Sequence, residues 1–200
     1  GRNVYRNIKN AIQFLLSGNM AGILAVLYCC VAGLPAPFAA VHLLFINLLT
    51  DSLPALAIGM ESVDERLLQD TPRDPSEKLL NSSFIRNMLI YGSMIAAVTI
   101  AAFYLGDPVH TVQTAMTMAF ATLTLARLFH GFNLRSKYSL VRIGLCSNRW
   151  SIAAFGVGVL LLVLVLCIPA ARSAFAASSL TGAQTASVAI LAGLPTIIIQ

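Results

Sequence analysis

The chain has 200 residues, of which 58% are hydrophobic and 10% are charged, and its formal net charge is +5 at pH 7. A soluble domain carries about 25% charged residues, so this composition excludes a soluble globular domain with a fully polar surface. The basic residues are spread between long apolar segments rather than gathered in one patch, which argues against nucleic acid as a partner.

Six apolar segments approach the length of about 20 residues that crosses a bilayer. We expect transmembrane helices, because a backbone in lipid has to satisfy its own hydrogen bonds. The expected spans are 6–31, 38–60, 84–105, 111–133, 150–171 and 184–200. The predicted fold class is therefore all-α, a polytopic membrane protein in which residues 1–200 form a six-helix transmembrane bundle.

The ends of the chain suggest a fragment. The first segment is too long for a signal peptide, and five more apolar segments follow it. The chain starts on Gly1 rather than Met, and its last apolar segment stops at the chain end. We therefore expect a piece of a longer protein.

Basic residues gather on one side of the expected membrane. They precede the first span and fill the loops 61–83 and 134–149, whereas the opposite loops hold only Arg172. This asymmetry follows the positive-inside rule. It predicts that the N-terminus and both loops are cytoplasmic, and with six spans the C-terminus is cytoplasmic as well.

The second span holds the main functional candidate. Asp51 is the only acidic residue inside any apolar segment, and a carboxylate in hydrocarbon usually marks an ion or proton pathway. On a helix, Asn47, Thr50 and Asp51 share one face. Pro54 has no N–H, so the Thr50 carbonyl loses its helical partner. Several oxygens around one formal charge suit a hard cation such as Ca²⁺, and broken helices at mid-membrane often build such sites.

Asn19 lies at a similar depth in the first span, which a short turn makes an antiparallel neighbour of the second. It can therefore face the polar cluster. Gly18 and Gly22 flank it in a G-x-x-x-G spacing, which we interpret first as close helix packing. Two alternatives remain open: Asn19 forms only an interhelical hydrogen bond, or the whole cluster is a buried polar network that fixes packing.

Arg127 is the only base deep inside an apolar segment. Either its side chain snorkels to the interface, or it is a tethered positive charge that pairs with Asp51 when no ion is bound. His130, one turn nearer the cytoplasm, is expected to be interfacial. The sequence holds no P-loop, H-E-x-x-H or G-x-S-x-G motif, so we assign no catalytic or cofactor-binding residue.

The stretch Asn47-Leu48-Leu49-Thr50-Asp51, followed by Leu53-Pro54-Ala55, is quite specific. Weaker motifs stand in a fixed order around it: Ser17-Gly18-Asn19, Leu34-Pro35, Pro72-Arg73, Met116-Thr117-Met118-Ala119-Phe120, Phe132-Asn133 and Leu194-Pro195. With these motifs the chain resembles, nearly end to end, the C-terminal membrane half of calcium-transporting P-type ATPases.

The resemblance implies transmembrane helices five to ten of a ten-helix pump. Its partners would be the lipid bilayer, the N-terminal half of the same pump and the transported calcium ion. ATP and Mg²⁺ would bind in cytoplasmic domains that these residues lack, so the fragment alone should hydrolyse nothing. The resemblance further implies that Asn19, Asn47, Thr50 and Asp51 bind the transported ion.

Two residues depart from the two-ion members of the resembled family, which carry glutamates where this chain has Gly22 and Arg127. The departures imply one Ca²⁺ per cycle, with Arg127 in the vacated space and with proton counter-transport. Manganese or another cation remains an alternative cargo, although Thr50 favours calcium. An ATP-independent secondary transporter or channel, or a structural membrane subunit, also remains open.

Overall fold

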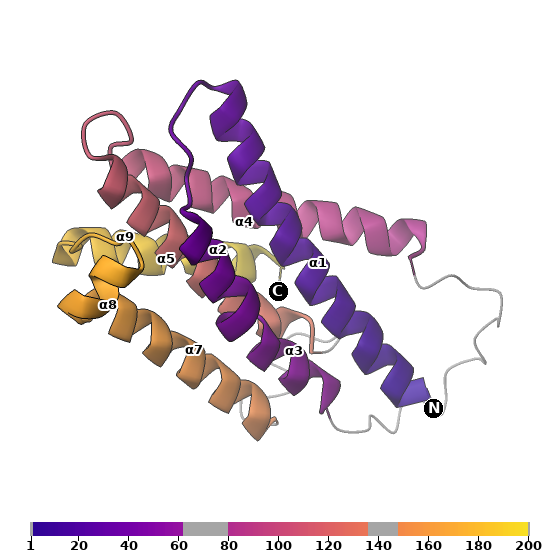
Figure 1. Cartoon of the computed structure of the whole chain (residues 1–200). Helices are drawn as coiled ribbons and strands as arrows, with labels where there is room; N and C mark the ends of the chain where they lie inside the picture. Colours follow the sequence, from indigo (N-terminus) through magenta and orange to yellow (C-terminus); the bar gives the residue numbers. More distant parts are fainter. Residues whose placement is uncertain (1, 62–79, 136–147, 200) are drawn as a thin grey trace.

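The structure is a computed structural model that describes residues 2–61, 80–135 and 148–199 (Figure 1). Every element in these ranges is helical, which confirms the all-α class. The elements are α1 (Arg2–Val31), α2 (Ala40–Phe45), η1 (Ile46–Thr50), α3 (Ser52–Gly59), α4 (Ser82–Leu105), α5 (Val112–Asn133), α7 (Arg149–Cys167), α8 (Pro169–Ala174) and α9 (Gly182–Ile199). Most of the loops 61–83 and 134–149, including Pro72-Arg73, lie outside the described residues.

Five of the described segments are long and apolar enough to cross a membrane: 3–31, 40–59, 82–105, 149–167 and 182–199. The second of them comprises α2, η1 and α3 in succession. The chain is thus a polytopic membrane protein. Helix α5 has 22 residues, which is a sufficient length, but it is not among the five because it is less apolar.

The position of α5 explains its composition. It packs against α1, α3, α4, α7 and α9, and fifteen of its residues are buried. Its side chains therefore meet protein on most sides and do not have to match lipid. The main hydrophobic core surrounds it, with Phe120, Met118 and Leu123 from α5 meeting Phe103 and Ile95 from α4.

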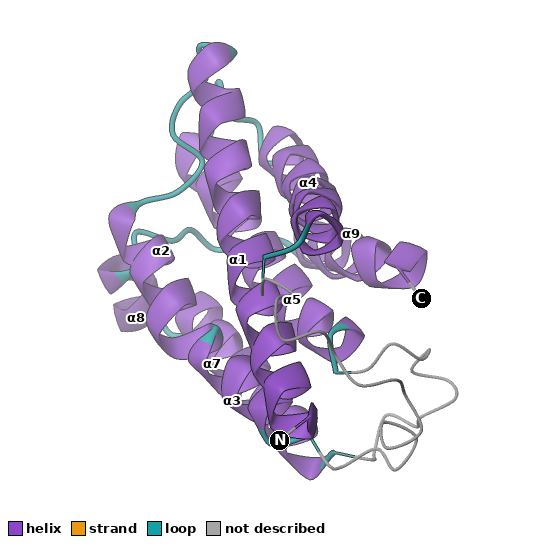
Figure 2. Ribbon diagram, turned by 90° about the vertical axis from the view of Figure 1, so that its right-hand side faces the viewer, coloured by secondary structure: helices purple, strands orange, loops and turns teal. Residues whose placement is uncertain are grey.

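The outer helices pack around this centre. Helix α1 lies against α4 and α3, and α4 also contacts α9 (Figure 2). The approach of α4 to α1 is close at Gly92, where a Cβ would lie 2.9 Å from Met20 Cγ. The crossing helices bring residues distant in sequence to the middle of the bundle.

Two expected spans differ from single continuous helices. The fifth was expected to reach residue 171, but α7 ends at Cys167. Pro169 biases the preceding residue away from helical geometry, and Ile168 is extended at φ −83° and ψ 119°. The second span is also interrupted, because η1 separates α2 from α3.

Candidate cation site

The helix that carries Asp51 widens immediately before it. Residues 46–50 form a π-helical turn in which the Asp51 N–H donates to the Ile46 carbonyl, five residues back, at 2.9 Å. The Thr50 hydroxyl donates to the same carbonyl at 3.0 Å. Single π-turns inside α-helices are rare, but those that occur are often found at functional sites. The sequence predicted a break caused by Pro54, but it did not predict this turn.

Pro54 then disturbs the ladder of hydrogen bonds on the other side of Asp51. It offers no N–H to the Thr50 carbonyl, while the next amide, of Ala55, donates to the Asp51 carbonyl at 3.1 Å. The backbone on both sides of Asp51 therefore departs from regular α-helix. Such a segment can turn main-chain oxygens toward a ligand.

Asp51 forms a buried ion pair with Arg127. The two side chains are 2% and 3% exposed, and Arg127 Nη2 donates to Asp51 Oδ2. The same nitrogen donates to Asn19 Oδ1 at 3.2 Å, so α1, α5 and the start of α3 meet here. Of the two interpretations of Arg127, snorkelling is wrong for this structure and pairing with Asp51 is observed.

A polar atom on each side chain of the pair takes no part in the ion pair. Asp51 Oδ1 and Arg127 Nε are buried, and neither has a hydrogen-bond partner among the described residues. Burying a polar atom without a partner costs free energy, which makes the free carboxylate oxygen a ready ligand for a cation.

Gly18 makes room for the Arg127 guanidinium. A Cβ at Gly18 would lie 2.4 Å from Arg127 Nε and 2.6 Å from its Cζ. At Gly22, by contrast, the nearest atom is Leu123 Cδ2 at 4.0 Å. Of this G-x-x-x-G pair, Gly18 is thus the glycine whose missing side chain the site requires.

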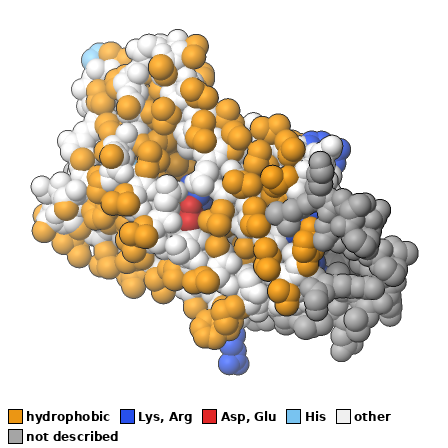
Figure 3. Space-filling model, turned by 45° about the vertical axis from the view of Figure 1, so that its right-hand side comes forward, with side chains coloured by type: hydrophobic (Ala, Val, Ile, Leu, Met, Phe, Trp, Pro, Cys, Tyr) orange, Lys and Arg blue, Asp and Glu red, His pale blue; other side chains and the backbone are white. Residues whose placement is uncertain are grey.

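The four predicted ligands differ in their placement. Thr50 and Asp51 are buried, whereas Asn19 and Asn47 are exposed. Asn47, at the start of the π-turn, is exposed, whereas Thr50 at its end is buried. It lies among exposed apolar side chains of the same segment, such as Leu44 and Leu48. Figure 3 shows a face of the molecule on which hydrophobic side chains predominate around a small polar area.

His130 is buried inside the helix bundle. Its side chain is 1% exposed, and its Nε2 lies 3.1 Å from Ser17 Oγ on α1. The imidazole is stacked on Phe14, with ring centroids 6.2 Å apart, and meets the edge of Tyr91. The sequence did not reveal this contact, because its partners come from two other helices, α1 and α4.

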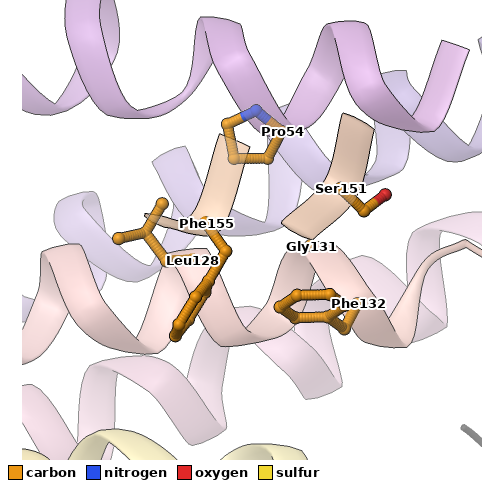
Figure 4. Close-up of a pocket in the computed structure, with 6 residues that line it drawn as sticks. All are labelled: Pro54, Leu128, Gly131, Phe132, Ser151 and Phe155. Carbon is orange, nitrogen blue, oxygen red and sulfur yellow. The ribbon is translucent and has the colours of Figure 1, made fainter. Parts of the chain in front are cut away.

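A small pocket lies on another side of Pro54. It is lined by Pro54, Leu128, Gly131, Phe132, Ser151 and Phe155 (Figure 4). Its lining holds no charged side chain, and a Cβ at Gly131 would lie 3.1 Å from Pro54 Cβ. The pocket lies where α3, α5 and α7 meet, and its lining includes none of the predicted cation ligands.

Among the described residues, no three or more His, Cys, Asp or Glu side chains come together to hold a metal ion. A cation at Asp51 would therefore depend on one carboxylate together with neutral hydroxyl, amide and main-chain oxygens. Such an all-oxygen set suits a hard cation rather than a soft transition metal.

The chain is similar to known proteins along nearly its whole length. The family model described as "Cation transporting ATPase, C-terminus" matches residues 35–200. "Calcium-transporting ATPase 1" of Bacillus cereus is 33% identical over 216 residues, covering 99% of this chain and 24% of the relative. "Calcium-transporting ATPase 1" of Lactococcus lactis is 38% identical over 77% of this chain and 18% of its own length.

A human relative, "Calcium-transporting ATPase type 2C member 1", is 30% identical over 90% of this chain and 20% of its own length. The chain thus spans about a quarter or less of the length of these relatives.

Proposed function

The chain belongs to the family of C-terminal regions of cation-transporting ATPases, and we propose that it is the cation-translocating membrane part of an ATP-driven calcium pump. The observation that carries the proposal is the Asp51 carboxylate, which is buried in a broken helix and has one oxygen without a hydrogen-bond partner in the part of the chain that the structure describes. The relatives, which are named calcium-transporting ATPases, support calcium as the cargo.

In this proposal the cation and Arg127 compete for Asp51. Without a cation, the guanidinium neutralises the carboxylate and occupies Asn19 Oδ1. An entering cation would displace the guanidinium and take the carboxylate, the Thr50 oxygens and the amide oxygens of Asn19 and Asn47. Both asparagines are exposed on this chain, so we expect the N-terminal half of the pump to cover them.

We further propose one Ca²⁺ per cycle. The two-ion pumps that the sequence resembles carry glutamates at the positions of Gly22 and Arg127. Here Gly22 has no side chain, and Arg127 supplies a positive charge instead of a carboxylate. Asp51 is then the only acid that the described spans contribute, and one carboxylate with neutral oxygens suits a single divalent ion. Proton counter-transport belongs to the same proposal: after calcium release, a proton would neutralise an acidic ligand that the N-terminal half of the pump contributes, while Arg127 neutralises Asp51.

The intact protein would be a P-type translocase of the cell membrane. ATP and Mg²⁺ would act in its cytoplasmic domains. The asymmetry of basic residues supports an orientation with both ends of this chain and the loop 61–83 in the cytoplasm.

The test is Asp51→Asn in the full-length protein, with calcium uptake into vesicles and calcium-dependent ATPase activity as readouts. We expect uptake to fall at least tenfold, a loss of about 1.4 kcal/mol or more in binding, because the only charged ligand of this segment is removed. Ser52→Ala is the matched control, since Ser52 is exposed and its hydroxyl donates to the Leu48 carbonyl.

Uptake that is unchanged in Asp51→Asn would refute the proposal. Because this variant leaves Arg127 buried without its partner, Asp51→Asn combined with Arg127→Met keeps the test valid if the single variant fails to fold. Preference for manganese over calcium, or two calcium ions per ATP, would refute the corresponding finer claim. Uptake that leaves vesicle pH unchanged would refute proton counter-transport.

A further inference from the structure

A second buried ion pair lies at the far end of α3. Arg135 Nε donates to Glu61 Oε2 at 2.9 Å, and its Nη2 donates to Oε1 at 3.2 Å. The two side chains are 1% and 9% exposed. This two-point geometry matches the fork of a guanidinium to the two oxygens of a carboxylate, which is the strong form of such pairs.

Asn148 completes the polar cluster from the start of α7. Its Nδ2 donates to Glu61 Oε2 at 2.7 Å and to the Ala57 carbonyl at 3.1 Å. Its Oδ1 accepts the N–H groups of Trp150 and Ser151 and so caps α7. One buried amide therefore ties the end of α3 to the beginning of α7.

Side chains of helix α1 hydrogen-bond to main-chain carbonyls at the end of α3. Asn7 Nδ2 donates to the Glu61 carbonyl at 2.9 Å and to the Gly59 carbonyl at 3.2 Å, and Asn3 adds a bond of 3.3 Å to Glu61. The last carbonyls of a helix have no intrahelical partner. Here side chains from other elements supply partners.

Both ion pairs connect α3 with α5. Arg127 lies within α5 and Arg135 just after its end, while Asp51 and Glu61 flank α3. Helix α3 has eight residues, which corresponds to a rise of about 12 Å. Because α3 is short and stiff, a fixed Glu61 restricts where Asp51 can lie.

We propose that Glu61, Arg135 and Asn148 form a clamp that positions Asp51 for the cation. The inference rests on the proposed function. When a cation displaces Arg127, the pair next to the site no longer holds α3 against α5. The clamp then remains as the buried ion pair between them, so its loss should weaken the cation-bound state in particular.

The test uses Glu61→Gln, Arg135→Gln and the double variant in the full-length pump, each normalised to folded protein. We expect each single variant to raise the calcium concentration for half-maximal ATPase activity about three- to tenfold, while the maximal rate falls less than twofold. The double variant should raise it less than the two single effects combined, because both substitutions remove the same contact between Glu61 and Arg135. Arg149→Gln, an exposed arginine next to Asn148, should leave the concentration unchanged.

Hydrogen exchange of the amides from residue 52 to 61 supplies a readout that does not depend on transport. We expect Glu61→Gln to accelerate exchange there and not in α9. Faster exchange with an unchanged calcium concentration for half-maximal activity would show that the clamp is merely structural and would overturn the proposal. Wild-type behaviour in both readouts would overturn it as well. Failure of the proposed function is distinguishable, because it would appear as calcium-independent activity in the wild type itself.

Discussion

At the scale of single residues, the site depends on a buried charge pair and on the space beside it. Breaking a buried pair by removing one partner typically costs about 3–5 kcal/mol, whereas the intact pair contributes little net stability. The pair of Asp51 and Arg127 is thus better suited to an exchange of partners than to holding the fold. Gly18 determines whether the guanidinium can lie where it does.

Gly18→Ala should displace the Arg127 side chain and destabilise the full-length protein by about 1–3 kcal/mol, the usual cost of overpacking a core. Thermal unfolding checks this. Gly22→Ala is the matched control on the same helix. Because its Cβ would meet Leu123 Cδ2 at an ordinary contact distance of 4.0 Å, we expect it to be neutral or stabilising by about 0.5–1 kcal/mol. Equal stability of the two variants would contradict the role given to Gly18.

Sequence alone drew attention to Asp51, Pro54 and Arg127, because a charge or a proline inside an apolar segment is a local anomaly. It did not identify the contacts of Gly18 or His130. These depend on the packing of α1 against α5, and the pattern of a single segment holds no information about the residue opposite.

At the scale of elements, the π-turn of η1 and Pro54 act on the same stretch of backbone. The turn redirects the chain before Asp51, and the proline removes an N–H after it. Helix existence was predictable throughout, since each long apolar segment is helical. The π-turn, the end of α7 at Cys167 and the exposure of Asn47 were not predicted, because local backbone geometry and tertiary contacts determine them.

Pro54→Ala tests this element. The new N–H would bond to the Thr50 carbonyl and remove it as a cation ligand. We expect calcium affinity to fall about tenfold, or about 1.4 kcal/mol, in a calcium titration of ATPase activity. Pro169→Ala, at the start of α8, is a control proline that should leave affinity unchanged. Unaltered affinity in Pro54→Ala would mean that the Thr50 carbonyl is no ligand.

At the scale of the whole molecule, the described helices differ in how much they are covered. In the most apolar stretch of α9, 17% of the residues are buried, whereas α2 to α3 reach 44%. Among the exposed side chains of α9 are Ile190, Ile197 and Ile198. We expect this surface to face lipid and the surface around Asn19 and Asn47 to face the rest of the pump.

Ile190→Lys tests the lipid-facing surface. Ile190 is 66% exposed and lies near the middle of α9, where lysine in place of isoleucine should cost about 3–4 kcal/mol of insertion free energy. A glycosylation reporter fused after residue 199 would show reduced insertion of Ile190→Lys. The control variant Ile190→Leu should insert as well as the wild type. Normal insertion of the lysine variant would indicate that this face is covered by protein.

The central place of α5 also bears on how the chain enters the membrane during synthesis. It is not among the described helices that are apolar enough to cross a membrane by length and composition, and it follows α4 after a turn of only residues 106–111. The turn is close-packed, because a Cβ at Gly106 would lie 2.4 Å from Ala115 Cα. We therefore expect the translocon to release α4 and α5 together as a helical hairpin, so that the arginine-bearing helix leaves the channel already shielded by its neighbour.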